Sequence, residues 1–113
     1  MPTTAPTYQE IPIACDLTAI PADERATHSA RAEQLLRTSA AEMQELPDGY
    51  AFRYAAAQYE LVTQFIANER LCCPFFTFTL EVTPAHGPLW LRITGREEVK
   101  DFLQSELVRC ACS

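Results

Sequence analysis

Residues 76–94 read FTFTLEVTPAHGPLWLRIT, and this stretch decides the fold. Apolar side chains alternate with polar ones on both sides of the central PAHGP. Such alternation is typical of a half-buried strand, and an interruption rich in proline and glycine is typical of a turn. The stretch therefore predicts a β-hairpin with one face turned to a core. The apolar positions are Phe76, Phe78, Leu80, Val82, Leu89, Leu91 and Ile93.

Two further strands are predicted nearer the N-terminus. Residues 11–17 read IPIACDL and alternate apolar and other side chains, which predicts a strand with Cys15 facing inward. The turn sequence LPDGY is followed by YAFRY, where Tyr50, Phe52 and Tyr54 share one side. These two strands and the hairpin make four strands in all.

Three segments show the spacing of three and four residues that is typical of an amphipathic helix. They are residues 21 to about 45, residues 57–73, and a last segment that follows Gly95. The second must end at Cys73, because a residue that precedes a proline, here Pro74, is pushed out of the helical region. The residues that define these stripes are Ala32, Leu35, Leu36, Ala40 and Met43, then Leu61, Val62, Phe65, Ile66, Glu69, Cys72 and Cys73, and finally Val99, Phe102, Leu103 and Leu107.

The resulting order, β-α-β-α-β-β-α, predicts an α+β fold in which three helices cover one face of a four-stranded sheet as a two-layer sandwich. A chain of 113 residues is long enough for one domain, which we place at residues 10–109. Residues 1–9 are expected to be a disordered segment and residues 110–113 a flexible tail. The open face of the sheet, with Tyr50, Tyr54 and Trp90 as candidates, should meet water or a second copy in a homodimer.

Charge and composition exclude several classes of protein. The net charge is −6 and the nine basic residues are dispersed, which disfavours binding of nucleic acid. No apolar run approaches the roughly 20 residues of a membrane helix, and the N-terminus lacks the features of a signal peptide. We therefore expect a cytoplasmic protein that does not bind membranes. In a reducing cytoplasm an odd set of five cysteines predicts free thiols or metal ligands rather than a disulfide framework.

The stretch NERLCCPFF, residues 68–76, contains the candidate site. Glu69 precedes Cys72 by three residues and Cys73 by four, so all three project from one side of a helix. Cys15 lies near the end of the first predicted strand on its apolar face. A helix packed on that face can bring its last turn to this strand end. We therefore predict a cluster of Cys15, Cys72 and Cys73.

Such a cluster suits a soft metal ion, because thiolates select thiophilic ions over harder ones. Three thiolates can hold Hg(II), As(III) or Cu(I), whereas Zn(II) requires a fourth ligand. Glu69 is the nearest candidate for that ligand, or for a group that hydrogen-bonds to the site. Cys110 and Cys112 in the tail are possible accessory ligands.

Three other interpretations remain open. A thioredoxin-like couple is disfavoured because the cysteine pair lies at the C-terminal end of its helix, lacks a CxxC spacing, and would form a strained ring if bridged to itself. The cysteines can instead be buried packing residues of an interaction or dimerisation module. A thiol-dependent enzyme acting on organometal or oxidised substrates would use Glu69 or Asp16 as proton donor. We expect binding rather than catalysis, and we interpret His28 and His86 as solvated surface residues.

The segments IACDL, ELPDGYAFRY, NERLCCPFF and GPLWLRITGREEVKDFL together resemble a group of small, largely uncharacterised bacterial proteins that carry an ERxCCPF segment. The likeness spans about residues 11–107. Members of that group occur alongside heavy-metal, particularly mercury, resistance functions. Cys15, Glu69, Cys72 and Cys73 match its pattern, whereas the tail cysteines lie outside it. The resemblance implies a metal-thiolate role, and we predict a protein that binds its ion in order to sequester, transfer or sense it.

Overall fold

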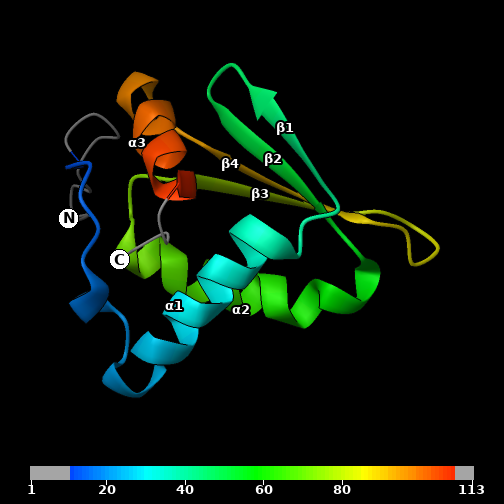
Figure 1. The fold of residues 1–113 in the computed structure, drawn as a ribbon, viewed down its shortest axis with the longest axis horizontal. Coiled ribbons are helices and arrows are strands. Elements are labelled where there is room, and N and C mark those ends of the chain that lie inside the picture. The colour runs from blue at the N-terminus through cyan, green and yellow to red at the C-terminus, as the bar shows by residue number, and fades with distance from the viewer. Residues whose placement is uncertain (1–10, 109–113) are drawn as a thin grey trace, which may run out of the picture.

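The computed structural model describes residues 11–108 and shows a helical layer packed on a sheet (Figure 1). The predicted α+β fold with a four-stranded sheet is confirmed. The order is α-β-β-α-β-β-α instead of the predicted β-α-β-α-β-β-α, because residues 11–17 form no strand and residues 42–46 form one. The elements are α1 (Arg25–Glu33), β1 (Glu42–Leu46), β2 (Gly49–Tyr54), α2 (Tyr59–Cys72), β3 (Thr77–Val82), β4 (Leu89–Thr94) and α3 (Glu97–Val108).

The four strands form one antiparallel sheet in the order β1-β2-β4-β3. The hairpin predicted from residues 76–94 is confirmed as β3 and β4, in which Leu80 lies opposite Leu91 and Phe78 lies opposite Ile93. A second hairpin, β1 and β2, joins it through the pairing of β2 with β4. Helix α2 connects the two hairpins along the chain, so its two ends lie at opposite ends of the sheet layer (Figure 1).

The helices cover one face of the sheet, as predicted. All three contribute to the main core with the central strands, so the packed face is the one that carries Phe52 and Leu91. Tyr50 and Tyr54 are buried on this same face, so their predicted place on the open face was wrong. The residues of this core are Ala32, Leu35, Leu36, Tyr50, Phe52, Tyr54, Val62, Phe65, Leu89, Leu91, Ile93 and Leu103.

The open face of the sheet carries the threonines of β3 and the ion pairs Arg53–Glu42 and Arg92–Glu81.

The predicted first strand does not enter the sheet. Its alternation is real, since Ile11, Ile13, Cys15 and Leu17 are partly buried while the residues between them are exposed. The segment is extended, however, and packs against the C-terminal end of α2 before a 3-10 turn at Leu17–Ala19. Alternating burial shows that every second side chain of an extended segment faces the protein interior. It does not show that the segment pairs with a neighbouring strand.

The predicted first helix was too long. Helix α1 continues through a π-helical turn, Gln34–Thr38, after which residues 42–46 turn into β1 instead of completing the helix. Met43, which fitted the helical stripe, is 53% exposed on this edge strand. A short connection through Pro47 and Asp48 leads to Gly49, where a Cβ would collide with the carbonyl oxygen of Ile93. Pairing with β2 thus overrides the weak helical preference of this Glu-rich run.

The Tyr54 hydroxyl links β2 to the helical layer, because it donates a hydrogen bond of 2.8 Å to the carbonyl oxygen of Leu35. Burial raises the pKa of Tyr54 above its ordinary value. Because its pKa is raised in the folded state, Tyr54 makes its full contribution to stability below the ordinary tyrosine pKa of about 10. That contribution is lost as the pH rises through the folded-state pKa.

Tyr54→Phe should therefore lower the free energy of unfolding by about 1 kcal/mol at neutral pH, with the deficit closing towards pH ~11. Urea unfolding at the two pH values measures both effects. Tyr59→Phe is the control, because Tyr59 is 47% exposed and should change neither value. A deficit that stays constant with pH would contradict the role assigned to the buried phenol.

Candidate metal centre

The three predicted cysteines meet at the C-terminal end of α2. Their sulfur atoms all lie within 4.8 Å of one another, so the predicted convergence is confirmed. Cys72 is the last residue of α2, and the backbone N–H of Cys73 donates to the Glu69 carbonyl oxygen at 2.7 Å. Cys15 arrives from the N-terminal segment, residues 11–20, which runs beside this helix end in Figure 1. Asp16 N–H donates to the Cys72 carbonyl oxygen at 2.8 Å and holds the two together.

Cys15 and Cys73 are joined by a disulfide, with their Cα atoms 4.6 Å apart. The prediction that these cysteines are free thiols was therefore wrong for this pair in the state observed, whereas their predicted role as metal ligands stays a prediction. Sequence reasoning weighed a bridge only between the neighbours Cys72 and Cys73. The observed partners are 58 residues apart along the chain, and only the packing of the N-terminal segment reveals them.

The cluster lies in a small apolar core of its own. Cys72 and Cys73 have no exposed surface, whereas Cys15 is partly exposed. Around them pack Ile20, Phe75 and Val99, and the Phe75 ring meets Phe102 edge-on at 5.0 Å. Cys72 and Cys73 are thus shielded from water, and Cys15 is the one cysteine of the cluster with exposed surface.

Contacts that do not involve sulfur also hold the N-terminal segment. Arg25 donates to the carbonyl oxygens of Ile20 and Thr18 at 3.0 and 3.1 Å, and Arg96 donates to that of Ile11. The apolar side chains of the segment add burial against Phe75 and Val99. Cys15 is therefore kept beside α2 by hydrogen bonds and packing as well as by the disulfide.

The structure places Glu69 in a buried pair with His28. Glu69 Oε1 lies 2.8 Å from His28 Nε2, the two side chains are 1% and 0% exposed, and the imidazole stacks on Phe65. The group of atoms that can hold an ion comprises the three cysteines without Glu69, whose predicted role as ligand or proton donor stays a prediction. The interpretation of His28 as a surface residue was wrong. Its position four residues before Ala32 on the apolar stripe was the signal that pointed inward.

The remaining predicted residues lie elsewhere. The Asp16 carboxylate is exposed and accepts a hydrogen bond of 3.0 Å from the Thr18 backbone N–H, which caps the 3-10 turn. Cys110 and Cys112 fall outside the described residues. His86 is exposed, as expected, at the tip of the β3–β4 hairpin.

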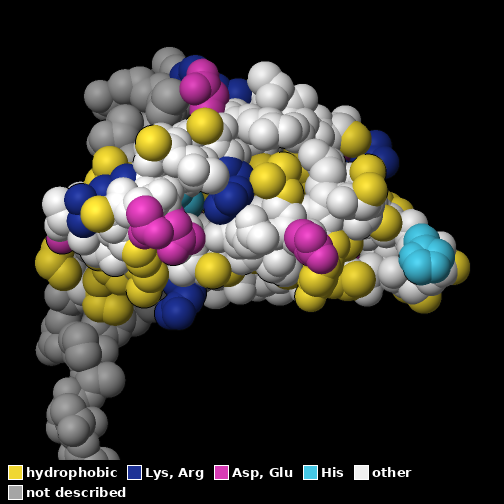
Figure 2. All heavy atoms as spheres, turned by 90° about the horizontal axis from the view of Figure 1, so that it is seen from below, with side chains coloured by type: hydrophobic (Ala, Val, Ile, Leu, Met, Phe, Trp, Pro, Cys, Tyr) yellow, Lys and Arg dark blue, Asp and Glu magenta, His cyan; other side chains and the backbone are white. Residues whose placement is uncertain are grey.

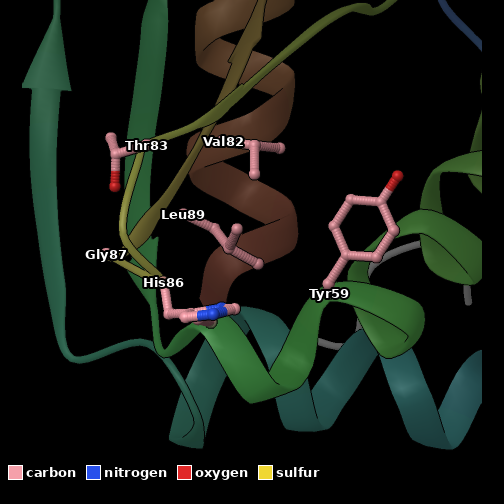
Figure 3. A pocket seen from close by; sticks show the side chains of 7 residues that line it. Tyr59, Val82, Thr83, His86, Gly87 and Leu89 are labelled. Carbon is pink, nitrogen blue, oxygen red and sulfur yellow. The ribbon is translucent and has the colours of Figure 1, made fainter.

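A pocket of about 310 Å³ lies between that hairpin tip and the start of α2 (Figure 3). Tyr59 and Val82 form its apolar walls and His86 lines its rim, with Ala85 and His86 both in the left-handed backbone region. Because Tyr59 begins α2 and Cys72 ends it, the pocket is about 20 Å from the cysteines along a helix that rises about 1.5 Å per residue. It belongs to a different part of the molecule.

Comparison of the chain with protein-family models, with curated proteins and with solved structures finds no match. Among residues 11–108, no helix combines the length and the apolar character needed to span a membrane. On the face shown in Figure 2, basic and acidic side chains are interspersed, and neither sign gathers into one patch. The cysteine cluster is therefore the feature from which a function can be argued.

Proposed function

We propose that the reduced protein binds one thiophilic metal ion through Cys15, Cys72 and Cys73, in order to sequester, transfer or sense it. The observation that carries this proposal is the convergence of three sulfur atoms within 4.8 Å. The non-covalent contacts of the N-terminal segment support it, because they keep Cys15 in place once the disulfide is reduced. When the ligands are already held together before the ion arrives, little conformational entropy is lost on binding.

The number of ligands favours ions that accept three thiolates. Bonds of about 2.3 Å around one ion separate trigonal sulfur atoms by about 4 Å, which the observed cluster can adopt by rotation of side chains. No further histidine, cysteine or carboxylate joins the group among the described residues. Zn(II), which prefers four ligands, is thus disfavoured relative to Hg(II), As(III) and Cu(I).

The net charge of the loaded site further restricts which ion it favours. Three thiolates with Cu(I) leave two buried negative charges, with Hg(II) one, and with As(III) none. Burial of net charge is costly, and the C-terminal end of α2 adds the negative end of the helix dipole. We therefore favour Hg(II) and As(III) over Cu(I). The resemblance to ERxCCPF proteins found with mercury-resistance functions supports Hg(II) as the ion met in the cell.

The ion preference is tested by native mass spectrometry of the reduced protein with Hg(II), As(III), Cu(I) or Zn(II), in the presence of a small competing dithiol. The variant Cys110→Ser/Cys112→Ser keeps tail thiols out of the measurement. We expect one Hg(II) or one As(III) per chain, with Zn(II) lost to the competitor. Retention of Zn(II) alone would contradict the three-ligand site. Retention of no ion would assign the cysteines to packing, as in an interaction module.

A further inference from the structure

The disulfide and the proposed ion require the same sulfur atoms. Cys15 and Cys73 are bonded to each other in the structure, and both belong to the group that can hold an ion. We propose that the cluster is a redox-gated site, closed to ions by the Cys15–Cys73 disulfide and opened by a dithiol reductant. This inference rests on the proposed function, since it names the chemistry that controls the same site.

Exposure determines where the reductant attacks. Thiol–disulfide exchange requires an incoming thiolate to reach one sulfur of the bridge. Cys73 has no exposed surface, whereas Cys15 is partly exposed on the N-terminal segment. The thiolate therefore bonds to Cys15, the bond between Cys15 and Cys73 breaks, and Cys73 leaves with the electron pair.

The second thiol of the same dithiol completes the reaction. It bonds to the first reductant sulfur, and Cys15 departs as a thiolate. Two electrons and two protons have then passed from the dithiol, which becomes a cyclic disulfide, to Cys15 and Cys73. Ion binding follows by exchange of thiol protons for the metal, as required when thiolates coordinate.

Reduction of the disulfide leaves the N-terminal segment in place beside α2. The hydrogen bonds of Asp16, Arg25 and Arg96 to backbone atoms hold the N-terminal segment, and none of them involves sulfur. Reduction of the Cys15–Cys73 bond thus converts a closed site into an open one while these hydrogen bonds stay in place. By the same logic a bound ion, which holds Cys15 and Cys73 as ligands, protects them from forming the disulfide.

The test uses the full chain with Cys110→Ser/Cys112→Ser, so that the only cysteines present are the three of the cluster. One sample is oxidised with a cyclic disulfide, a second is reduced with a dithiol, and each is desalted and given one equivalent of Hg(II). Native mass spectrometry counts the bound ions. A non-reducing tryptic digest then seeks a link between residues 1–25 and residues 71–92. In this digest a Cys72→Ser variant should keep the link, and a Cys73→Ser variant should lose it.

We expect one Hg(II) in the reduced sample, none in the oxidised sample, and recovery of binding when the oxidised sample is reduced again. Equal binding by both samples, or absence of the linked peptides after oxidation, would overturn the gate while leaving the proposed metal site standing. Linked peptides together with no Hg(II) in the reduced sample would overturn the proposed function itself. Prior loading with Hg(II) should also prevent the linked peptides from forming.

Discussion

Replacing Cys72 and Cys73 together by serine should abolish stoichiometric binding of Hg(II) by the reduced protein. Serine hydroxyls remain protonated at neutral pH and bind soft ions poorly, so two of the three ligands are lost. Loss of an outer hydrogen-bond partner at a metal site already weakens affinity roughly 10–100-fold, and removal of direct ligands should exceed that. Competition against a dithiol, followed by native mass spectrometry, measures the loss.

The matched control is Cys110→Ser/Cys112→Ser, which also removes two cysteines and should leave one ion bound. Burying serine hydroxyls at Cys72 and Cys73, which are 0% exposed, should cost about 1–3 kcal/mol of stability per site if the hydroxyl finds no partner. Circular dichroism of the double variant must therefore show a folded protein before its binding is interpreted. Equal Hg(II) binding by the double variant and the control variant would place the ion elsewhere.

The parts of the fold that could be predicted from the sequence are those where periodicity and burial coincide. The hairpin of β3 and β4, the end of α2 before Pro74, and the shared face of Val62 and Phe65 all follow from spacing. Residues 42–46 could not be assigned in this way, because Met43 fits a helical stripe and its strand partner Phe52 is known only from the sheet. Strand order depends on such partners as well.

The candidate site, too, could be predicted where local patterns determine it and could not be predicted where it depends on packing between distant segments. The convergence of Cys72 with Cys73 follows from helix geometry, and the inward direction of Cys15 follows from the alternation of residues 11–17. That Cys15 would bond to Cys73 depends on the docking of the N-terminal segment, which no local pattern encodes. The partner of Glu69 was hidden for a similar reason, since it comes from α1, 41 residues earlier.

His28→Ala and Glu69→Ala should each destabilise the protein by about 3–5 kcal/mol, because either change leaves a buried polar or charged group without its partner. The pair joins α1 to α2 at 2.8 Å with both side chains almost fully buried, so water cannot replace the missing group. Urea unfolding measures the loss as a shift of the midpoint. The double variant His28→Leu/Glu69→Met replaces both partners by apolar groups. Its free energy of unfolding should be closer to that of the wild type than the value of either alanine variant.

Glu69→Gln separates the pairing role from the predicted role in metal binding. The glutamine carbonyl can still accept a hydrogen bond from His28, so stability should fall by only about 1 kcal/mol. If Glu69 serves α1 and α2 alone, as its contact with His28 indicates, this variant binds Hg(II) as tightly as wild type. A marked loss of Hg(II) affinity at nearly unchanged stability would instead make Glu69 a fourth ligand. A third alanine variant, His28→Ala/Glu69→Ala, tests whether the two residues act as a coupled pair, because residues in direct contact should show an interaction energy. A loss of stability equal to the sum of the two single losses would argue against that coupling.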